Sequence, residues 1–255
     1  MKFNLISCLV GVSAASAVCR AEGNNPPEPP KNYAVAMYNS FDIIDVFGPI
    51  DVLFYLSLMK QLNLNLIAET MDPVWMRPPN KELNKFGSNF TAAFKPTHTY
   101  DSPPDNVEVL IVPGGLGMRF GNSSDLAVDY VRKTYPKLKY LLTICTGAGI
   151  AAKAGVLDGK RATTNKSAWK EVMPLGPKVK WVSPARWTID GNIWTSSGVT
   201  SGFDLIFEFI DKIYDKEVSR KIQGAVEHVR AKDACDDPFA EWHKVPPTGD
   251  CKASS

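Results

Sequence analysis

The stretch that decides the fold is YLLTICTGAG, residues 140–149. Residues 140–144 form an apolar run with one threonine, which is typical of a strand buried on both faces of a parallel sheet. Cys145 follows directly, and residues 146–154 are mostly small, as in a helix packed closely on such a sheet. The stretch therefore predicts a strand, a tight turn bearing a cysteine, and a helix. That geometry presents a nucleophile at the carboxyl edge of a sheet.

Strand and helix patterns alternate on both sides of this stretch. Strands are expected at residues 33–38, 62–68 and 107–112, part of a hairpin at 86–94, and a second hairpin at 187–195 around Asp190-Gly191. Helices are expected over residues 44–58, 124–135, 201–214 and 216–230. This order predicts an α/β fold, a three-layer sandwich with a mostly parallel central sheet of the flavodoxin-like kind.

Composition limits the function classes. The 255 residues include 29 Lys+Arg and 27 Asp+Glu, and 44% are hydrophobic. Removing residues 1–21 takes away Lys2 and Arg20 and no acid, which leaves 27 of each sign. Such a neutral chain lacks the basic surface that nucleic-acid binding requires, and its hydrophobic fraction excludes both long disorder and a multispan membrane protein.

The N-terminus has the pattern of a secretory signal. Lys2 precedes an apolar stretch that ends at the small-residue sequence Ala15-Ser16-Ala17, and this stretch is shorter than a membrane span. We expect a signal peptide at residues 1–21, a Pro-rich linker at 22–32, one domain at 33–239 and a polar C-terminal tail at 240–255. The mature protein is then secreted, with no membrane association.

Secretion changes how the cysteines are interpreted. Cys235 and Cys251 flank a polar segment, and an oxidising compartment favours a bridge between them worth about 3 kcal/mol over two unpaired thiols. Cys145 then remains unpaired, either buried and inert or kept for its reactivity. Three glycosylation sequons, at Asn89, Asn122 and Asn165, agree with the secretory signal.

Three segments are predicted to meet around Cys145. A helix N-terminus beside the thiol is expected to lower its pKa, although a core cysteine ending a strand would show the same pattern. Gly114-Gly115 follows a buried strand and offers backbone N–H groups to a developing negative charge, or simply forms a turn. Asp45 follows the first strand and is placed to transfer a proton, whereas Asp51 fits better as a helix N-terminal charge.

In order and spacing, these segments resemble the ThiJ/PfpI superfamily, relatives of the class I glutamine amidotransferases. The similarity covers residues 33–239 and is strongest to the isonitrile hydratase-like branch, which also includes the sensor halves of AraC-type regulators. Four motifs carry it: Asp45-Val-Phe-Gly-Pro-Ile-Asp51-Val, Val112-Pro-Gly-Gly115, Ile144-Cys-Thr-Gly147 and Ala154-Gly-Val-Leu-Asp-Gly-Lys-Arg-Ala-Thr-Thr164.

The resemblance implies a role for each site residue. Cys145 is the thiolate that attacks the terminal carbon of an isonitrile, Thr146 hydrogen-bonds within the site, and Asp45 is the acid and base. Gly114 and Gly115 supply backbone donors. Water then releases an N-substituted formamide. A small-molecule substrate and a homodimer are implied, with no metal or organic cofactor. A regulator is not expected, because the residues after the last predicted helix leave no room for a helix-turn-helix.

The sequence departs from the superfamily in two places. Thr146 stands where protease-like members have a histidine after the cysteine, and Asn165 stands where the branch usually has a histidine. The three histidines, His98, His228 and His243, are expected to be ordinary polar residues. Three functions stay open: isonitrile hydration, another cysteine-dependent activity such as glyoxal or aldehyde conversion or amide hydrolysis, and non-catalytic binding in the same fold.

Overall fold

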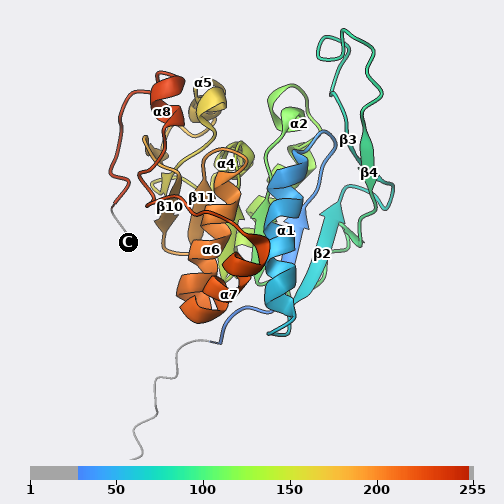
Figure 1. The fold of residues 1–255 in the computed structure, drawn as a ribbon. Helices are drawn as coiled ribbons and strands as arrows, with labels where there is room; N and C mark the ends of the chain where they lie inside the picture. Colours follow the sequence, from blue (N-terminus) through green and yellow to red (C-terminus); the bar gives the residue numbers. More distant parts are fainter. Residues whose placement is uncertain (1–27, 253–255) are drawn as a thin grey trace, which may run out of the picture.

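Within residues 28–252, which the computed structural model describes, a seven-stranded sheet lies between two layers of helices (Figure 1). The predicted signal peptide and residues 22–27 of the linker lie outside the described residues. The strand order is β10 (Trp187–Asp190), β11 (Ile193–Ser196), β7 (Tyr140–Thr143), β6 (Val109–Val112), β1 (Asn32–Ala36), β2 (Asn63–Ala68) and β5 (His98–Thr99). Neighbours pair parallel except β10 and β11. The predicted mostly parallel sandwich is confirmed.

Helices cover both faces of this sheet. On the near face in Figure 1, α1 (Ile43–Ser57), α6 (Ser201–Ile213) and α7 (Lys216–Val226) pack against one another, while α3 (Asp125–Thr134) and α4 (Gly147–Lys153) pair on the far face. Shorter helices follow in the connections: α2 (Leu116–Arg119), α5 (Trp169–Val172), α8 (Phe239–Trp242), and the 3₁₀ turns η1 (Tyr135–Lys137), η2 (Lys166–Ala168) and η3 (Met173–Leu175). Between residues 28 and 252, none of the helices has the length and apolar character that crossing a bilayer requires.

Two small strand pairs extend the body. β3 (Val74–Met76) pairs antiparallel with β4 (Ala92–Phe94), and the connecting residues 77–91 project beyond the sandwich (Figure 1). The hairpin predicted at 86–94 thus contains β4, but its partner strand lies further back in the sequence than the pattern showed. β8 (Arg161–Ala162) pairs parallel with β9 (Lys180–Trp181) beside the seven-stranded sheet.

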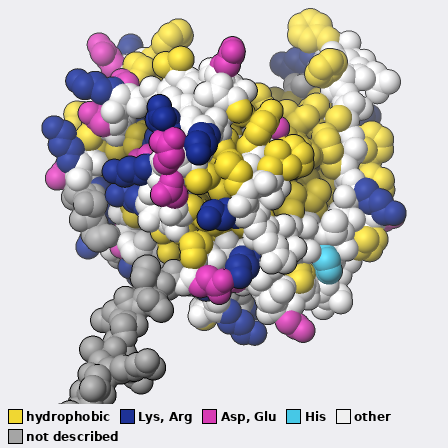
Figure 2. All heavy atoms as spheres, turned by 60° about the horizontal axis from the view of Figure 1, so that its bottom comes forward, with side chains coloured by type: hydrophobic (Ala, Val, Ile, Leu, Met, Phe, Trp, Pro, Cys, Tyr) yellow, Lys and Arg dark blue, Asp and Glu magenta, His cyan; other side chains and the backbone are white. Residues whose placement is uncertain are grey.

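Several large hydrophobic side chains are exposed, and some of them form two groups. The α1 patch consists of Phe54, Leu58, Met59 and Leu64, of which Leu58 is 67% exposed. Figure 2 shows hydrophobic side chains gathered around α1. The tip of the projecting loop carries further ones, with Phe86 97% exposed. A large contiguous apolar patch is uncommon on the surface of a monomeric protein.

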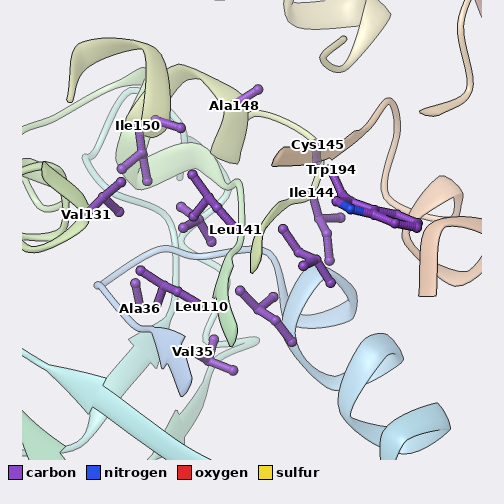
Figure 3. Close-up of a cluster of buried hydrophobic side chains, with 14 of the residues drawn as sticks. Val35, Ala36, Leu110, Val131, Leu141, Ile144, Cys145, Ala148, Ile150 and Trp194 are labelled. Carbon is purple, nitrogen blue, oxygen red and sulfur yellow. The ribbon is translucent and has the colours of Figure 1, made fainter. Parts of the chain in front are cut away.

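The core lies on the central strands, whose continuous apolar runs bury both faces. Every residue of β6 is buried, and so are three of the four residues of β7. Cys145 belongs to the same buried cluster as Ile144, Ala148 and Trp194 (Figure 3). The strands therefore hold the cysteine in a rigid and largely dry environment.

The segment predicted as a polar C-terminal tail packs against the domain. Cys235 and Cys251 form a disulfide with an S–S distance of 1.96 Å. Thr248 pairs with Ser183 through two backbone hydrogen bonds of 2.6 and 2.8 Å, and Val245 is buried. Composition indicated only a polar segment, since the anchoring contacts join residues distant in sequence.

Candidate active site

Cys145 lies on a strained turn between β7 and α4. Its φ angle is 57°, a left-handed conformation that costs a non-glycine residue about 1 kcal/mol or more. The turn depends on Gly147, because a Cβ at that position would lie 2.1 Å from the Val112 carbonyl oxygen of β6. The strain and the close approach together place the sulfur at the carboxyl edge of the sheet, as the sequence predicted.

Asp45 approaches Cys145 from the first turn of α1. Its carboxyl group is fully buried, and its Oδ2 accepts a 2.8 Å hydrogen bond from the Gly114 amide. The Cys145 thiol interacts with the same carboxyl group and acts to lower its pKa. Burial raises the pKa of Asp45 well above its usual value, and the charge of Asp42 acts in the same direction. A buried carboxyl group and a buried thiol therefore lie next to each other, which is an arrangement that general acid–base catalysis can use.

Gly114 and Gly115 form the wall of the site, but not in the role expected. The Gly114 N–H is used by Asp45, and the Gly115 N–H donates to Thr146 Oγ1 at 3.0 Å. A Cβ on Gly114 would lie 2.5 Å from the Thr146 nitrogen, so glycine is needed for this contact. The predicted oxyanion donors are thus engaged within the protein, where they orient Asp45 and Thr146. Among backbone groups, the N–H of Thr146 interacts with the sulfur instead.

Asn165 contacts the nucleophile, a role that the sequence did not predict, although its place in the branch's histidine position put it at the wall of the pocket and made its sequon suspect. Its Nδ2 donates to Cys145 Sγ at 3.2 Å. Its Oδ1 accepts from Ser167 N at 2.8 Å, Ser167 Oγ at 2.6 Å and Ala168 N at 3.3 Å, which fixes the orientation of the amide. The signal was present in the sequence, because Asn165 replaces the histidine usual in the branch.

This geometry also changes the interpretation of the sequons. A glycan on Asn165 would be attached to the nitrogen that faces the sulfur, so the predicted modification there conflicts with the site. Asn89 and Asn122 are exposed, and glycosylation at these two positions stays a prediction.

The thiol pKa differs from the expectation. Burial raises the pKa of Cys145 well above its usual value, and the nearby Asp45 carboxylate raises it further. The Asn165 amide and the Thr146 backbone N–H act in the opposite direction but do not outweigh burial. The expected lowering by the helix N-terminus fails because α4 has only seven residues and the sulfur lies in a dry cluster beside a carboxylate.

Two further side chains border the site. The buried Tyr38 hydroxyl donates to the Pro113 carbonyl oxygen at 3.0 Å, and burial keeps its pKa well above the usual value. Arg119 on α2 forms a two-point ion pair with Glu171 on α5, with distances of 2.6 and 2.7 Å, and its charge interacts with that of Cys145. Tyr38 therefore holds the loop that contains Gly114 and Gly115, while Arg119 joins α2 to α5.

The histidines do not take part in this site. His228 stacks on Phe207 and hydrogen-bonds to the buried Asp204, which is a structural role. His98 contacts Thr97 on the edge strand, and His243 ends α8. No group of three His, Cys, Asp or Glu side chains within residues 28–252 has the arrangement of a metal site.

Fold and site together define a class: an α/β sandwich with a cysteine on a strained strand-to-helix turn and a carboxyl group beside it. The DJ-1/PfpI family pattern matches residues 33–212, and the chain belongs to this family. It is 27% identical over 188 residues to the isonitrile hydratase of Pseudomonas putida, covering 74% of each chain.

Two further relatives extend this comparison. The chain is 34% identical over 96 residues to a deglycase of Pyrococcus abyssi, covering 38% of this chain and 55% of that protein. A ThiJ/PfpI family protein from Pseudomonas syringae superposes with a TM-score of 0.66 at 23% identity, over 87% of this chain and 91% of that one. This structural likeness supports the fold, whereas activity depends on the site.

Proposed function

We propose that this protein is a secreted, cysteine-dependent enzyme that adds water to an isonitrile and yields an N-substituted formamide. The observation that carries the proposal is the buried Asp45–Cys145 pair without a histidine. An isonitrile carbon is both nucleophilic and electrophilic, so a thiol that adds to it must deliver its proton to the same carbon. A thiol and carboxyl pair that shares protons in a dry site suits this requirement. The similarity to a Pseudomonas isonitrile hydratase supports the same reaction.

The reaction balances with these residues alone. Cys145 Sγ forms a bond to the terminal carbon, and Asp45 passes the thiol proton to that carbon, which gives a thioimidate, S–CH=N–R. Water then adds to the carbon as Asp45 removes one of its protons, and the nitrogen is protonated. The tetrahedral intermediate expels the sulfur, which regains a proton, and R–NH–CHO is released. No metal or cofactor takes part in these steps.

The neighbouring groups have distinct parts in this scheme. The Asn165 amide and the Thr146 backbone N–H stabilise negative charge on the sulfur when it forms and when it is expelled. The Thr146 hydroxyl accepts from Gly115 and so fixes the wall of the site. Cys145 is only 5% exposed, and this limited access to its sulfur favours a small substrate.

A second activity is supported by a separate observation. The similarity to a deglycase favours conversion of glyoxals or aldehydes at the same cysteine. To separate the two, the purified protein is incubated in parallel with an aryl isonitrile and with methylglyoxal, each with Cys145→Ala as control. Formamide that requires Cys145 supports the proposal. Methylglyoxal consumption with no formamide selects the alternative, and inertness to both selects a binding protein.

Secretion and dimerisation belong to the same proposal. The Cys235–Cys251 disulfide is stable in an oxidising compartment and agrees with the signal-like N-terminus. The exposed α1 patch offers an apolar surface for a second copy of the chain. Intact mass of the secreted protein, and its mass in solution by light scattering, test these two statements.

A further inference from the structure

Lys166 is buried beside the active site. Its side chain is 0% exposed, and four oxygen atoms lie within hydrogen-bond distance of Nζ: Thr163 Oγ1 at 2.9 Å, Thr164 O at 3.2 Å, Ala185 O at 3.0 Å and Ser197 Oγ at 2.9 Å. An ammonium group in such a place costs several kcal/mol of desolvation unless a counter-ion and hydrogen bonds offset it. Burial lowers the pKa of Lys166, and a nearby carboxylate opposes that shift.

The counter-ion comes from the C-terminal strap, defined as residues 235–251. Asp237 Oδ2 lies 2.9 Å from Lys166 Nζ, and its side chain is 1% exposed. The strap is closed by the Cys235–Cys251 disulfide, so Asp237 is two residues from a covalent anchor. The C-terminal strap therefore places the Asp237 carboxylate inside the domain, where it forms an ion pair with Lys166.

The ion pair adjoins the residues that contact the nucleophile. Lys166 follows Asn165 directly in the sequence, and Thr164 precedes Asn165. The Lys166 ammonium group binds the Thr164 carbonyl oxygen. The Thr164 hydroxyl donates to the Cys145 carbonyl oxygen at 2.9 Å. Asn165 therefore lies between Thr164, whose carbonyl the ammonium group binds, and Lys166, which carries that ammonium group. The Asn165 amide faces the sulfur.

We propose that Lys166 and Asp237 are positioning residues, which hold the Asn165 amide against Cys145 Sγ so that the C-terminal strap sets the reactivity of the nucleophile. The inference rests on the proposed function only in treating Cys145 as the nucleophile, and it holds for any substrate. Stability alone does not explain the arrangement, because buried ion pairs are frequently no more stabilising than apolar pairs of similar size.

The test measures the alkylation of Cys145 by iodoacetamide as a function of pH, read by mass spectrometry on the peptide that contains Cys145. Asn165→Ala removes the donor to the sulfur and is expected to slow alkylation at pH 7 about tenfold, the loss typical of a hydrogen bond to a charged group. Asp237→Asn is expected to slow it in the same direction, and Asn165→Ala/Asp237→Asn to be no slower than Asn165→Ala. This non-additivity is what a role acting through Asn165 requires.

Two further variants guard against a general loss of structure. Glu108→Gln weakens the ion pair with Lys139 at the amino-terminal edge of the sheet, and it is expected to lower the unfolding midpoint without changing Cys145 alkylation. If Asp237→Asn does not fold, Lys166→Met/Asp237→Leu replaces the buried charges with apolar groups and is expected to slow alkylation as well.

Three results would overturn the inference. One is a wild-type alkylation rate in the Asp237 variant or in its apolar substitute. Another is a wild-type rate in Asn165→Ala, and the third is a further slowing by Asp237→Asn when Asn165 is already alanine. Because alkylation by iodoacetamide needs no isonitrile, the two proposals can be tested separately. The inference can fail while the proposed reaction holds, and the proposed reaction can fail while the inference holds.

Discussion

Replacing Asp45 by asparagine should make Cys145 more reactive to alkylation and at the same time abolish turnover of an isonitrile. The carboxylate has two effects in this site. Its negative charge raises the pKa of the thiol, and in the proposed reaction it carries the proton between sulfur and carbon. Asparagine keeps the shape of the side chain and an acceptor for the Gly114 amide, but it removes the charge and the proton.

The size of the first effect follows from the contact between the two groups. Two like charges about 4 Å apart repel by about 4 kcal/mol at an effective dielectric constant of ~20, so a neighbouring carboxylate opposes thiolate formation strongly. Removing this repulsion should lower the pKa of the Cys145 thiol, since the Asp45 carboxylate is one of the causes that raise it. A lower pKa increases the fraction of thiolate at pH 7 but makes the thiolate a weaker nucleophile. The net gain in alkylation rate is about threefold for each unit by which the thiol pKa falls. Loss of general acid–base catalysis should lower turnover by about 10²–10⁴-fold.

The assay follows iodoacetamide labelling of the Cys145 peptide between pH 5 and 10, beside formamide formation from an aryl isonitrile. Asp51→Asn, which removes an exposed carboxylate from the same helix, is the matched control and should change neither quantity. The reasoning is refuted if the Asp45 variant shows an unchanged or higher thiol pKa, or if it forms formamide at the wild-type rate.

Other predictions concern the wall, the strap, the surface and stability. Gly114→Ala should lower the free energy of unfolding by about 2–4 kcal/mol, because its Cβ would lie 2.5 Å from Thr146; urea denaturation measures this, and an unchanged midpoint would count against it. Cys235→Ser should cost about 3 kcal/mol in the same measurement, and no loss would mean that the strap is held without its disulfide. Phe54→Glu should convert the proposed dimer to a monomer in light scattering, whereas an intact dimer would place the interface elsewhere. Because burial raises the pKa of Asp45, the stabilisation linked to its protonated form is complete below the unfolded value of ~3.9 and is lost as the pH rises through the folded value. Asp45→Asn should therefore gain stability relative to the wild type between pH 4 and 8, and parallel pH profiles would contradict this.

Features that depend on residues close together in the sequence could be predicted from it. Two local patterns predicted parts of the sheet. Continuous apolar runs are typical of strands buried on both faces, as β6 and β7 are, and an Asp-Gly dipeptide is typical of a tight hairpin turn, as at Asp190-Gly191 between β10 and β11. The meeting of Cys145 and Asp45 also followed from sequence, since both come after parallel strands whose carboxyl ends share one edge.

Features that depend on distant contacts could not be predicted in this way. The β8–β9 pair and the short edge strand β5 are too brief to carry a periodic signal. Lys166 resembles any polar residue of a loop until the fold brings Asp237 against it. The direction of the Cys145 pKa shift depends on how deeply the surrounding chain buries the sulfur, which the presence of a following helix does not reveal.

The central claim is that Cys145 forms a covalent bond to the carbon of an isonitrile. The most direct measurement is the mass of the Cys145 peptide after a brief incubation with an aryl isonitrile and acid quenching. The account predicts an adduct whose added mass equals that of the isonitrile, absent in Cys145→Ala and accumulating before formamide appears. Formamide produced at an equal rate by Cys145→Ala, with no adduct on Cys145 of the wild type, would contradict it.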